Sequence, residues 1–117
     1  MKYLLTAALM AASVSAQAAE TIDCGEVALK TVYVQADRED GSFHANKMLL
    51  LMGAGKNAAC SDITFAYLEN NDDAYDSTLS MAISAYMAGK KLRVVVEDAP
   101  AQADAKRIAW VNFGIRD

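Results

Sequence analysis

The sequence is poor in the side chains that carry most metal and nucleophilic chemistry. Its 117 residues include one histidine, one tryptophan, one proline and two cysteines. There is no C-x-x-C spacing, and His44 lies far along the chain from both cysteines, which argues against a zinc or thiol centre. Ser42 is too close to His44 in sequence to be a separately placed nucleophile, so a surface histidine is the favoured interpretation. We therefore expect no catalytic residue, no metal site and no cofactor.

Basic clusters are also absent. The chain has 11 Lys and Arg against 15 Asp and Glu, a formal net charge of −4. Nucleic acids and anionic lipid surfaces attract patches of Lys and Arg, so we expect neither as a partner. The acidic run "ENNDDAYD", residues 69–76, lacks the central glycine and ligand spacing of a calcium loop. The glycines around Lys56 in "GAGKNAACS" lack the G-K-[ST] triplet of a phosphate-binding loop.

Long apolar runs are missing except at the start of the chain. Lys2 precedes an apolar stretch from Leu4 to Val14, and the small residues of "SAQAAE" form an A-x-A cleavage signal. This pattern is typical of a secretory signal peptide, and the run is shorter than the ~20 residues that a membrane span needs. We expect cleavage near Ala18 or Ala19, no membrane insertion, and a secreted or periplasmic product. The expected leader covers residues 1–19, and the expected single domain covers residues 20–117.

Both cysteines, Cys24 and Cys60, lie in the expected mature domain. An even number of cysteines in an exported chain predicts a disulfide. Closing a loop of roughly 37 residues stabilises a folded domain by about 4 kcal/mol in the chain-entropy model. This is a large share of the ~5–10 kcal/mol expected for a domain of this size.

Hydrophobic patterning predicts five strands. Residues 25–40 alternate in the manner of a strand, over a length that predicts a bend or bulge within it. Met48–Met52 form a continuous apolar run, which is typical of a strand covered on both faces. The other three strands are expected in "DITFAYLEN", "LRVVVED" and "KRIAWVNFGI", which begin at Asp62, Leu92 and Lys106.

One amphipathic helix is expected between the third and fourth strands. Asp76 or Ser77 suits its N-cap, because a side-chain oxygen there can accept from amides of the first turn. Gly89 suits the left-handed position that ends a helix. Apolar residues recur at i, i+4, i+7 and i+8, a stripe that should face the interior. This stripe consists of Leu79, Ile83, Tyr86 and Met87.

The order of elements predicts the fold class. Three strands, one helix and two further strands is the order of the OB-fold, a five-stranded Greek-key barrel. The apolar face of the helix would close one end of such a barrel. The alternative is an α+β sandwich in which the helix lies on an open sheet. Both are mainly β with one helix.

The last predicted strand is apolar on both faces. Val111, Phe113 and Ile115 alternate with Ile108 and Trp110. A monomeric barrel buries one face of each strand, so we expect packing between subunits to cover the other. The same pattern places Trp110 in the core.

The segment "LSMAISAYMAGKKLRVVVED", Leu79 to Asp98, with "AAC" upstream, resembles the binding subunits of AB5 toxins of the subtilase-cytotoxin type. The shared features are a helix of small and aromatic residues, a glycine, a polar turn and a V-R-[IV]-x-[YV] strand, here "GKKLRVVV". The resemblance implies a secreted OB-fold, often a ring of five, that binds cell-surface glycans beside a secreted catalytic subunit. Sugar-binding members have a serine at the start of strand one and a tyrosine at the end of strand four. Cys24 and Val96 stand there in this chain, so recognition of the sialic-acid type is not carried over.

We therefore predict a secreted, non-catalytic binding protein that recognises a glycan or a protein surface. It is expected to act as a homo-oligomer, for which the resemblance implies a pentamer. The alternative is a monomeric periplasmic OB-fold protein of the stress or envelope-maintenance type, binding a small molecule or a protein. The sequence names neither the ligand nor the ligand-binding residues.

Overall fold

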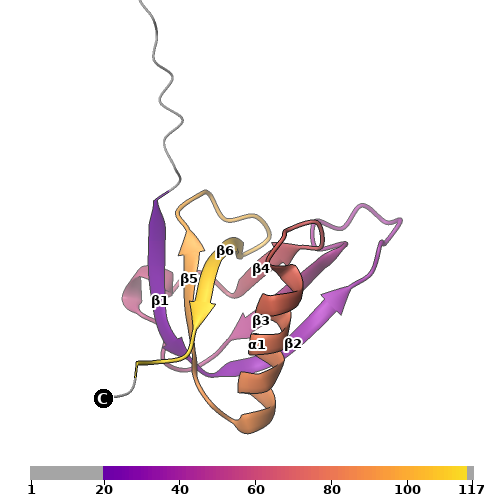
Figure 1. Ribbon diagram of the computed structural model, residues 1–117. Coiled ribbons are helices and arrows are strands. Elements are labelled where there is room, and N and C mark those ends of the chain that lie inside the picture. Colours follow the sequence, from indigo (N-terminus) through magenta and orange to yellow (C-terminus); the bar gives the residue numbers. More distant parts are fainter. Residues whose placement is uncertain (1–19, 116–117) are drawn as a thin grey trace, which may run out of the picture.

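The computed structural model describes residues 20–115, so the expected leader, residues 1–19, lies outside the described residues. The described chain is mainly β with one α-helix, as predicted (Figure 1). The strands are β1 (Thr21–Val27), β2 (Leu29–Gln35), β3 (Lys47–Met52), β4 (Phe65–Glu69), β5 (Leu92–Glu97) and β6 (Ala105–Asn112). The helices are α1 (Tyr75–Ala88) and a short 3-10 turn, η1 (Ala58–Cys60). Neither helix has the length and hydropathy needed to cross a membrane within this described range.

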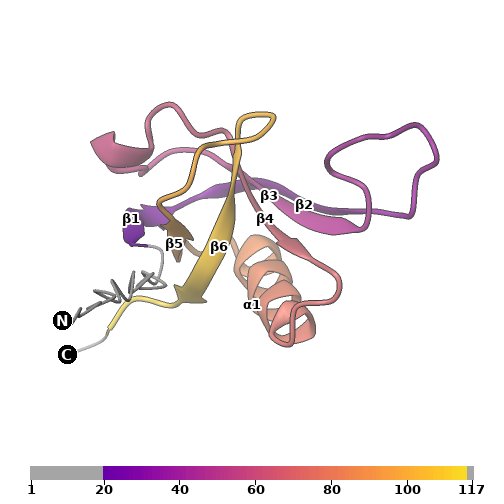
Figure 2. The same cartoon turned by 90° about the horizontal axis from the view of Figure 1, so that it is seen from above.

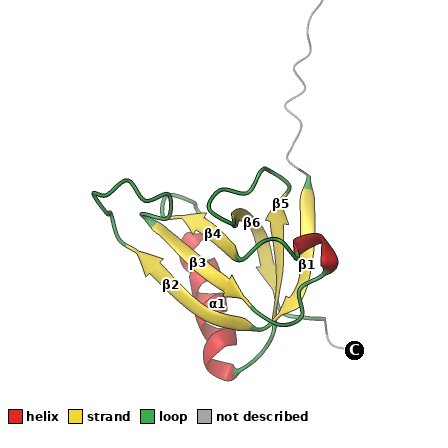
Figure 3. Ribbon diagram, turned by 180° about the vertical axis from the view of Figure 1, so that it is seen from behind, coloured by secondary structure: helices red, strands yellow, loops and turns green. Residues whose placement is uncertain are grey.

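The six strands form one mixed sheet in the order β1-β5-β6-β4-β3-β2. All neighbouring pairs are antiparallel except β4 and β6, which are parallel. The two edge strands, β1 and β2, are consecutive in the chain and are separated only by Ala28. The sheet must therefore curve strongly to bring its two edges together, as Figure 3 shows. The helix α1 packs against β2, β3 and β6 (Figure 2).

The predicted single strand over residues 25–40 is two strands, so the predicted count of five is wrong. Ala28 interrupts it by pairing with a loop. Its N–H donates to the carbonyl oxygen of Ala54 at 2.9 Å, and its carbonyl oxygen accepts from the N–H of Gly53 at 2.8 Å. On either side of this residue the chain pairs with different strands, β1 with β5 and β2 with β3. The bend predicted within this long segment is therefore the point at which the chain stops pairing with β5 and begins to pair with β3.

The predicted disulfide is confirmed. Cys24 in β1 and Cys60 in η1 are bonded, with their Cα atoms 5.3 Å apart, and both are fully buried. The bond ties the loop after β3 to the edge strand β1. Disulfides persist in oxidising compartments, so this one is compatible with a location outside the cytoplasm.

The helix buries a different face from the predicted one. Of the predicted stripe only Leu79 packs on the core, while Ile83, Tyr86 and Met87 are exposed. The buried face consists of Thr78, Ala82 and Ala85. These residues also recur at i, i+4 and i+7, and their small side chains let the helix approach the sheet closely. Larger apolar side chains at these three positions would hold the helix away from the sheet.

The helix α1 has no side-chain cap at its N-terminus but ends at a left-handed glycine. At the N-terminus the cap residue is Ala74, which makes no side-chain cap, so the predicted cap at Asp76 or Ser77 is wrong. Asp72 holds the preceding turn, because its Oδ1 accepts from the N–H of Ala74 at 2.8 Å. At the C-terminus Gly89 adopts the predicted left-handed conformation, with φ 64°.

Candidate functional site

The outward face of β1, β5 and β6 brings polar side chains together around one aromatic ring. The sheet register aligns Asp23, Val95 and Trp110 across the three strands, and it pairs Arg93 with Asn112. Alternate residues of a strand share a face, and the side chains between them, such as Val94, point into the core. We call this surface the polar face. Its members are Asp23, Arg93, Val95, Glu97, Arg107, Trp110 and Asn112.

A bulge in β1 directs Asp23 outward. The pairing with β5 shifts register between Asp23 and Glu26, and in this bulge Cys24 turns inward to its disulfide. Gly25 takes φ 82°, which favours glycine, and its N–H donates to Oδ1 of Asp23 at 2.8 Å. Asn57 holds the bulge from the facing loop. Its Nδ2 donates to the carbonyl oxygen of Asp23 at 3.0 Å, and its backbone N–H donates to that of Cys24 at 2.9 Å.

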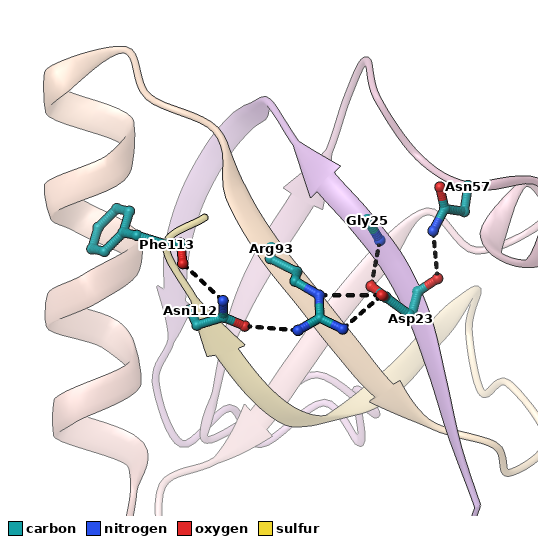
Figure 4. A network of polar contacts seen from close by, with 6 residues as sticks. All are labelled: Asp23, Gly25, Asn57, Arg93, Asn112 and Phe113. Atoms are coloured by element: carbon teal, nitrogen blue, oxygen red, sulfur yellow. Dashed lines mark hydrogen bonds and ion pairs between the residues drawn. The ribbon is translucent and has the colours of Figure 1, made fainter. Parts of the chain in front are cut away.

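Arg93 connects β1 to β6 across this face (Figure 4). Its Nη2 and Nε donate to Oδ2 of Asp23 at 2.7 and 3.1 Å, and its Nη1 donates to Oδ1 of Asn112 at 3.4 Å. These hydrogen bonds lower the pKa of the Asp23 carboxyl, and the carboxylate in turn raises the pKa of Arg93. Asn112 is oriented by its own bond to the carbonyl oxygen of Phe113, 2.8 Å away. A guanidinium has five N–H donors, so two remain beyond these three contacts.

A second guanidinium lies further along β6. Nη1 of Arg107 donates to Oε1 of Glu97 at 2.8 Å, and its Nη2 bonds the carboxylate of Asp72. The cluster thus joins β6, β5 and the loop that leads into α1. Both carboxylates and the guanidinium are partly buried, so the three side chains are held in place.

Trp110 lies between these two clusters and is 45% exposed, so its predicted place in the core is wrong. The pairing of β5 with β6 shifts register beside Ala109. This bulge lets Ile108 and Val111 both face inward and turns the indole ring outward. Val95, its partner in the register, is only 1% exposed although it lies on the outward face.

Two pockets adjoin Trp110 and Asn112. The Trp110 pocket, about 260 Å³, lies where β6 separates from β4 beyond Arg107 and α1 spans the gap. Met81 and Leu68 contribute apolar walls, and polar groups lie at its rim. These polar rim residues are Asp72, Ser77 and Arg107. The Arg93 pocket, about 360 Å³, is lined by Asp23, Glu26, Arg93, Asn112 and the chain at Gly114 and Ile115.

This arrangement suits a ligand with one apolar face and several hydroxyl groups. An exposed indole offers a flat apolar surface with a polar edge. Carboxylates and guanidinium groups form stronger hydrogen bonds than neutral groups, and their planar geometry gives them direction. A few oriented polar groups around an apolar surface are typical of small-ligand sites. Sugar rings have this combination of an apolar face and peripheral hydroxyls.

The positions that hold a serine and a tyrosine in the resembled family do not belong to this surface. Cys24 and Val96 are both fully buried. Neither side chain is available to a ligand, so a site at those positions is not built here.

His44 is part-buried rather than at the open surface. Its ring packs edge-on against Phe43 and Phe65, with centroids 5.4 and 5.7 Å apart, on the outward side of β3 and β4. Nζ of Lys47 lies 4.5 Å above the ring of Phe43. These side chains pack against one another and hold the loop after β2 against the sheet. Their rings are therefore less accessible to a ligand than the ring of Trp110. Among the residues placed in the structure, no three His, Cys, Asp or Glu side chains are grouped to hold a metal ion, and this includes the acidic run at 69–76.

Sequence reasoning identified Trp110 but assigned it to the core, and it missed the polar clusters entirely. Asp23 and Arg93 are 70 residues apart, and no local pattern marks them as partners. The alternation of β5, with Arg93, Val95 and Glu97 on one face, was the one available signal. No protein-family model matches this sequence and no characterised protein matches it significantly, so the toxin-subunit resemblance rests on the residues quoted for it.

Proposed function

We propose that this protein is a secreted, non-catalytic binding protein that recognises a glycan through the polar face. The observation that carries the proposal is Trp110, an exposed indole on a sheet whose flanking side chains are two guanidinium–carboxylate clusters. Solvation of a large aromatic ring is unfavourable, and exposed tryptophans are enriched where partners bind. The polar groups around it are already oriented by one another, which reduces the entropy lost on binding.

The strand order supports an OB-type barrel as the scaffold. If β1 and β2 are counted as halves of one bent strand, the chain has five strands with α1 between the third and fourth. The two edges of the sheet are then joined through Ala28. The parallel pairing of β4 with β6 links the remaining strands into one continuous sheet between those edges. The proposal assigns no catalytic group, because the carboxylates of Asp23 and Glu97 are each paired with a guanidinium.

Exposed apolar side chains on α1 support a homo-oligomer. Ile83, Tyr86 and Met87 lie on the outer side of the helix, with Met87 the most exposed of the three. Contiguous apolar surface of this kind is typical of subunit contacts. A ring of five, and a secreted catalytic subunit as its partner, are the assembly that the resemblance implies.

A glycan array tests the proposed function. The protein spanning residues 20–117, with its disulfide formed, is compared with Trp110→Ala and with Phe113→Ala, a matched control that removes another exposed aromatic ring from the same end of the chain. We expect glycan binding by the wild type and by the control, and loss of at least tenfold in affinity for Trp110→Ala. Light scattering after size exclusion gives the oligomeric state of the same samples. A strict monomer that binds no glycan would contradict the proposal and favour the periplasmic alternative.

A further inference from the structure

We propose that the polar face selects a neutral oligosaccharide of at least two sugar units over an anionic one. This inference rests on the proposed function, and it follows from the charges and spacings of the side chains already placed. Its two parts, neutrality and length, come from separate observations.

The first observation is the charge balance around the two pockets. Four carboxylates line or directly bond the pocket side chains, against two guanidinium groups. The carboxylates are Asp23, Glu26, Asp72 and Glu97. The guanidinium groups are Arg93 and Arg107. The two pockets and the side chains bonded to them therefore carry a net charge of −2, in a chain that is itself acidic. Lys106 adds no free positive charge nearby, because its Nζ lies 3.7 Å from the carboxylate of Asp98.

The second observation is that both guanidinium groups are already bonded to carboxylates of the protein. Arg93 places two of its donors on Asp23, and Arg107 bridges Glu97 and Asp72. An anionic ligand that paired fully with either guanidinium would have to displace one of these carboxylates, which would leave a protein charge without its partner. At the remaining N–H groups of Arg93 an anion would lie beside the Asp23 carboxylate, which repels it. Sugar hydroxyls need no such exchange, because each can donate to a carboxylate and accept from a remaining N–H. The same side chains thus accept neutral hydroxyls and disfavour a carboxylate or sulfate.

The third observation is the spacing of the contacts. The register places Trp110, Val95 and Asp23 on three adjacent strands. Neighbouring strands are about 4.8 Å apart, so the backbones at Asp23 and Trp110, which lie two strands apart, are separated by about 10 Å. A single sugar ring stacked on the indole does not extend to Asp23. A ligand that contacts both pockets therefore needs a second unit.

A third pocket adjoins the Arg93 pocket. At the C-terminal end of α1, Lys90 and Lys91 line a pocket of about 560 Å³ together with Phe113 and Ile115. It shares Glu26, Gly114 and Ile115 with the Arg93 pocket but contains no residue of the Trp110 pocket. An anion attracted to these lysines would bind without touching Trp110, and the test separates the two locations.

The test uses matched pairs of glycans that differ only in charge. The neutral member of each pair, such as lactose, is compared with its sialylated and sulfated derivatives by titration calorimetry at low salt. Two net negative charges at about 8 Å in water weaken binding of a monoanion about fivefold, so we expect the neutral member to bind at least that much more tightly. Asp23→Asn keeps an oxygen for the N–H of Gly25 and removes one charge, and it should reduce this difference to about twofold.

The outcomes decide separately on the preference for a neutral ligand and on the requirement for two sugar units. Tighter binding of the anionic member by the wild type overturns the preference for a neutral ligand, and its loss in Lys90→Ala/Lys91→Ala would locate the anion at the lysine pocket. Equal affinity for a monosaccharide and its disaccharide overturns the requirement for two units. If no member of any pair binds, the proposed glycan function itself fails, which is distinguishable from a reversed preference.

Discussion

The buried face of α1 can be tested by one substitution that overfills it. Ala82 is fully buried against the sheet, whereas its neighbour Ile83 is 46% exposed on the outer side of the same helix. Replacing Ala82 with leucine adds three carbon atoms where the small side chain lets the helix lie close to the strands. Overpacking of this kind costs about 1–3 kcal/mol. We therefore expect Ala82→Leu to be clearly destabilising.

Ile83→Ala is the matched control, because it removes three carbon atoms from the adjacent position. The isoleucine side chain is only half covered, and alanine has the higher helix propensity, so the net cost should be below about 1 kcal/mol. The sequence pattern alone predicts the opposite ranking, since it places Ile83 in the core stripe and gives Ala82 no role.

Urea unfolding followed by far-UV circular dichroism measures the difference. For a domain of this size, with a urea m-value of about 1–1.5 kcal/mol/M, Ala82→Leu should lower the midpoint by about 0.7–3 M and Ile83→Ala by less than about 1 M. Light scattering at the same protein concentrations shows whether either change alters association, because Ile83 belongs to the proposed subunit contact. A larger loss of stability for Ile83→Ala than for Ala82→Leu would refute the assigned face.

Three further predictions concern the disulfide, a close backbone contact and the ion pair that support β1. Reduction of Cys24–Cys60, which closes a loop over a sequence separation of 36, should cost about 4 kcal/mol in urea unfolding, and a reductant that leaves the midpoint unchanged would contradict this. Gly55 has φ 101°, and a Cβ there would lie 2.3 Å from the carbonyl oxygen of Glu26, whereas Gly41 has φ 76° with nothing within 4 Å. Gly41→Ala should therefore cost about 1 kcal/mol and Gly55→Ala at least about 2 kcal/mol, as measured by thermal unfolding, and equal costs would argue against the close approach. Because Arg93 lowers the pKa of Asp23 in the folded state, their pairing stabilises the protein above a pH of about 4 and this contribution disappears as the pH falls through the lowered pKa. Asp23→Asn should thus be less stable than the wild type by no more than about 1 kcal/mol near neutral pH and equally stable in strong acid, and a difference that persists there would exclude the ion pair as its cause.

The elements with strong local patterns agree closely with prediction. The apolar run at Met48–Met52 is β3, and "LRVVVED" is β5 almost residue for residue. Gly89 ends the helix because a left-handed residue there needs no tertiary partner. The disulfide was predictable because two cysteines allow only one pairing within the chain.

The face of α1 was not predictable from its pattern. Two apolar faces overlap on this helix, one of large residues around Ile83 and one of small residues around Ala82. Hydrophobicity favours the first face, but the close packing of the helix on the sheet buries the small residues, and of the predicted large stripe only Leu79 contacts the core. The distance between helix and sheet is a property of the packed structure and has no counterpart in local sequence.

The sequence by itself determined the strands β3 and β5, the helix and its end at Gly89, and the covalent link between Cys24 and Cys60. The strands and the helix depend on hydrophobic periodicity and on backbone conformations that act over short stretches of chain. The disulfide follows because two cysteines allow only one pairing within the chain. Only the tertiary structure decided that the chain changes partners at Ala28, that Trp110 faces outward, and that Asp23 meets Arg93. Each of these depends on bulges and registers between segments distant in the chain, where a shift of one residue moves a side chain to the opposite face of the sheet.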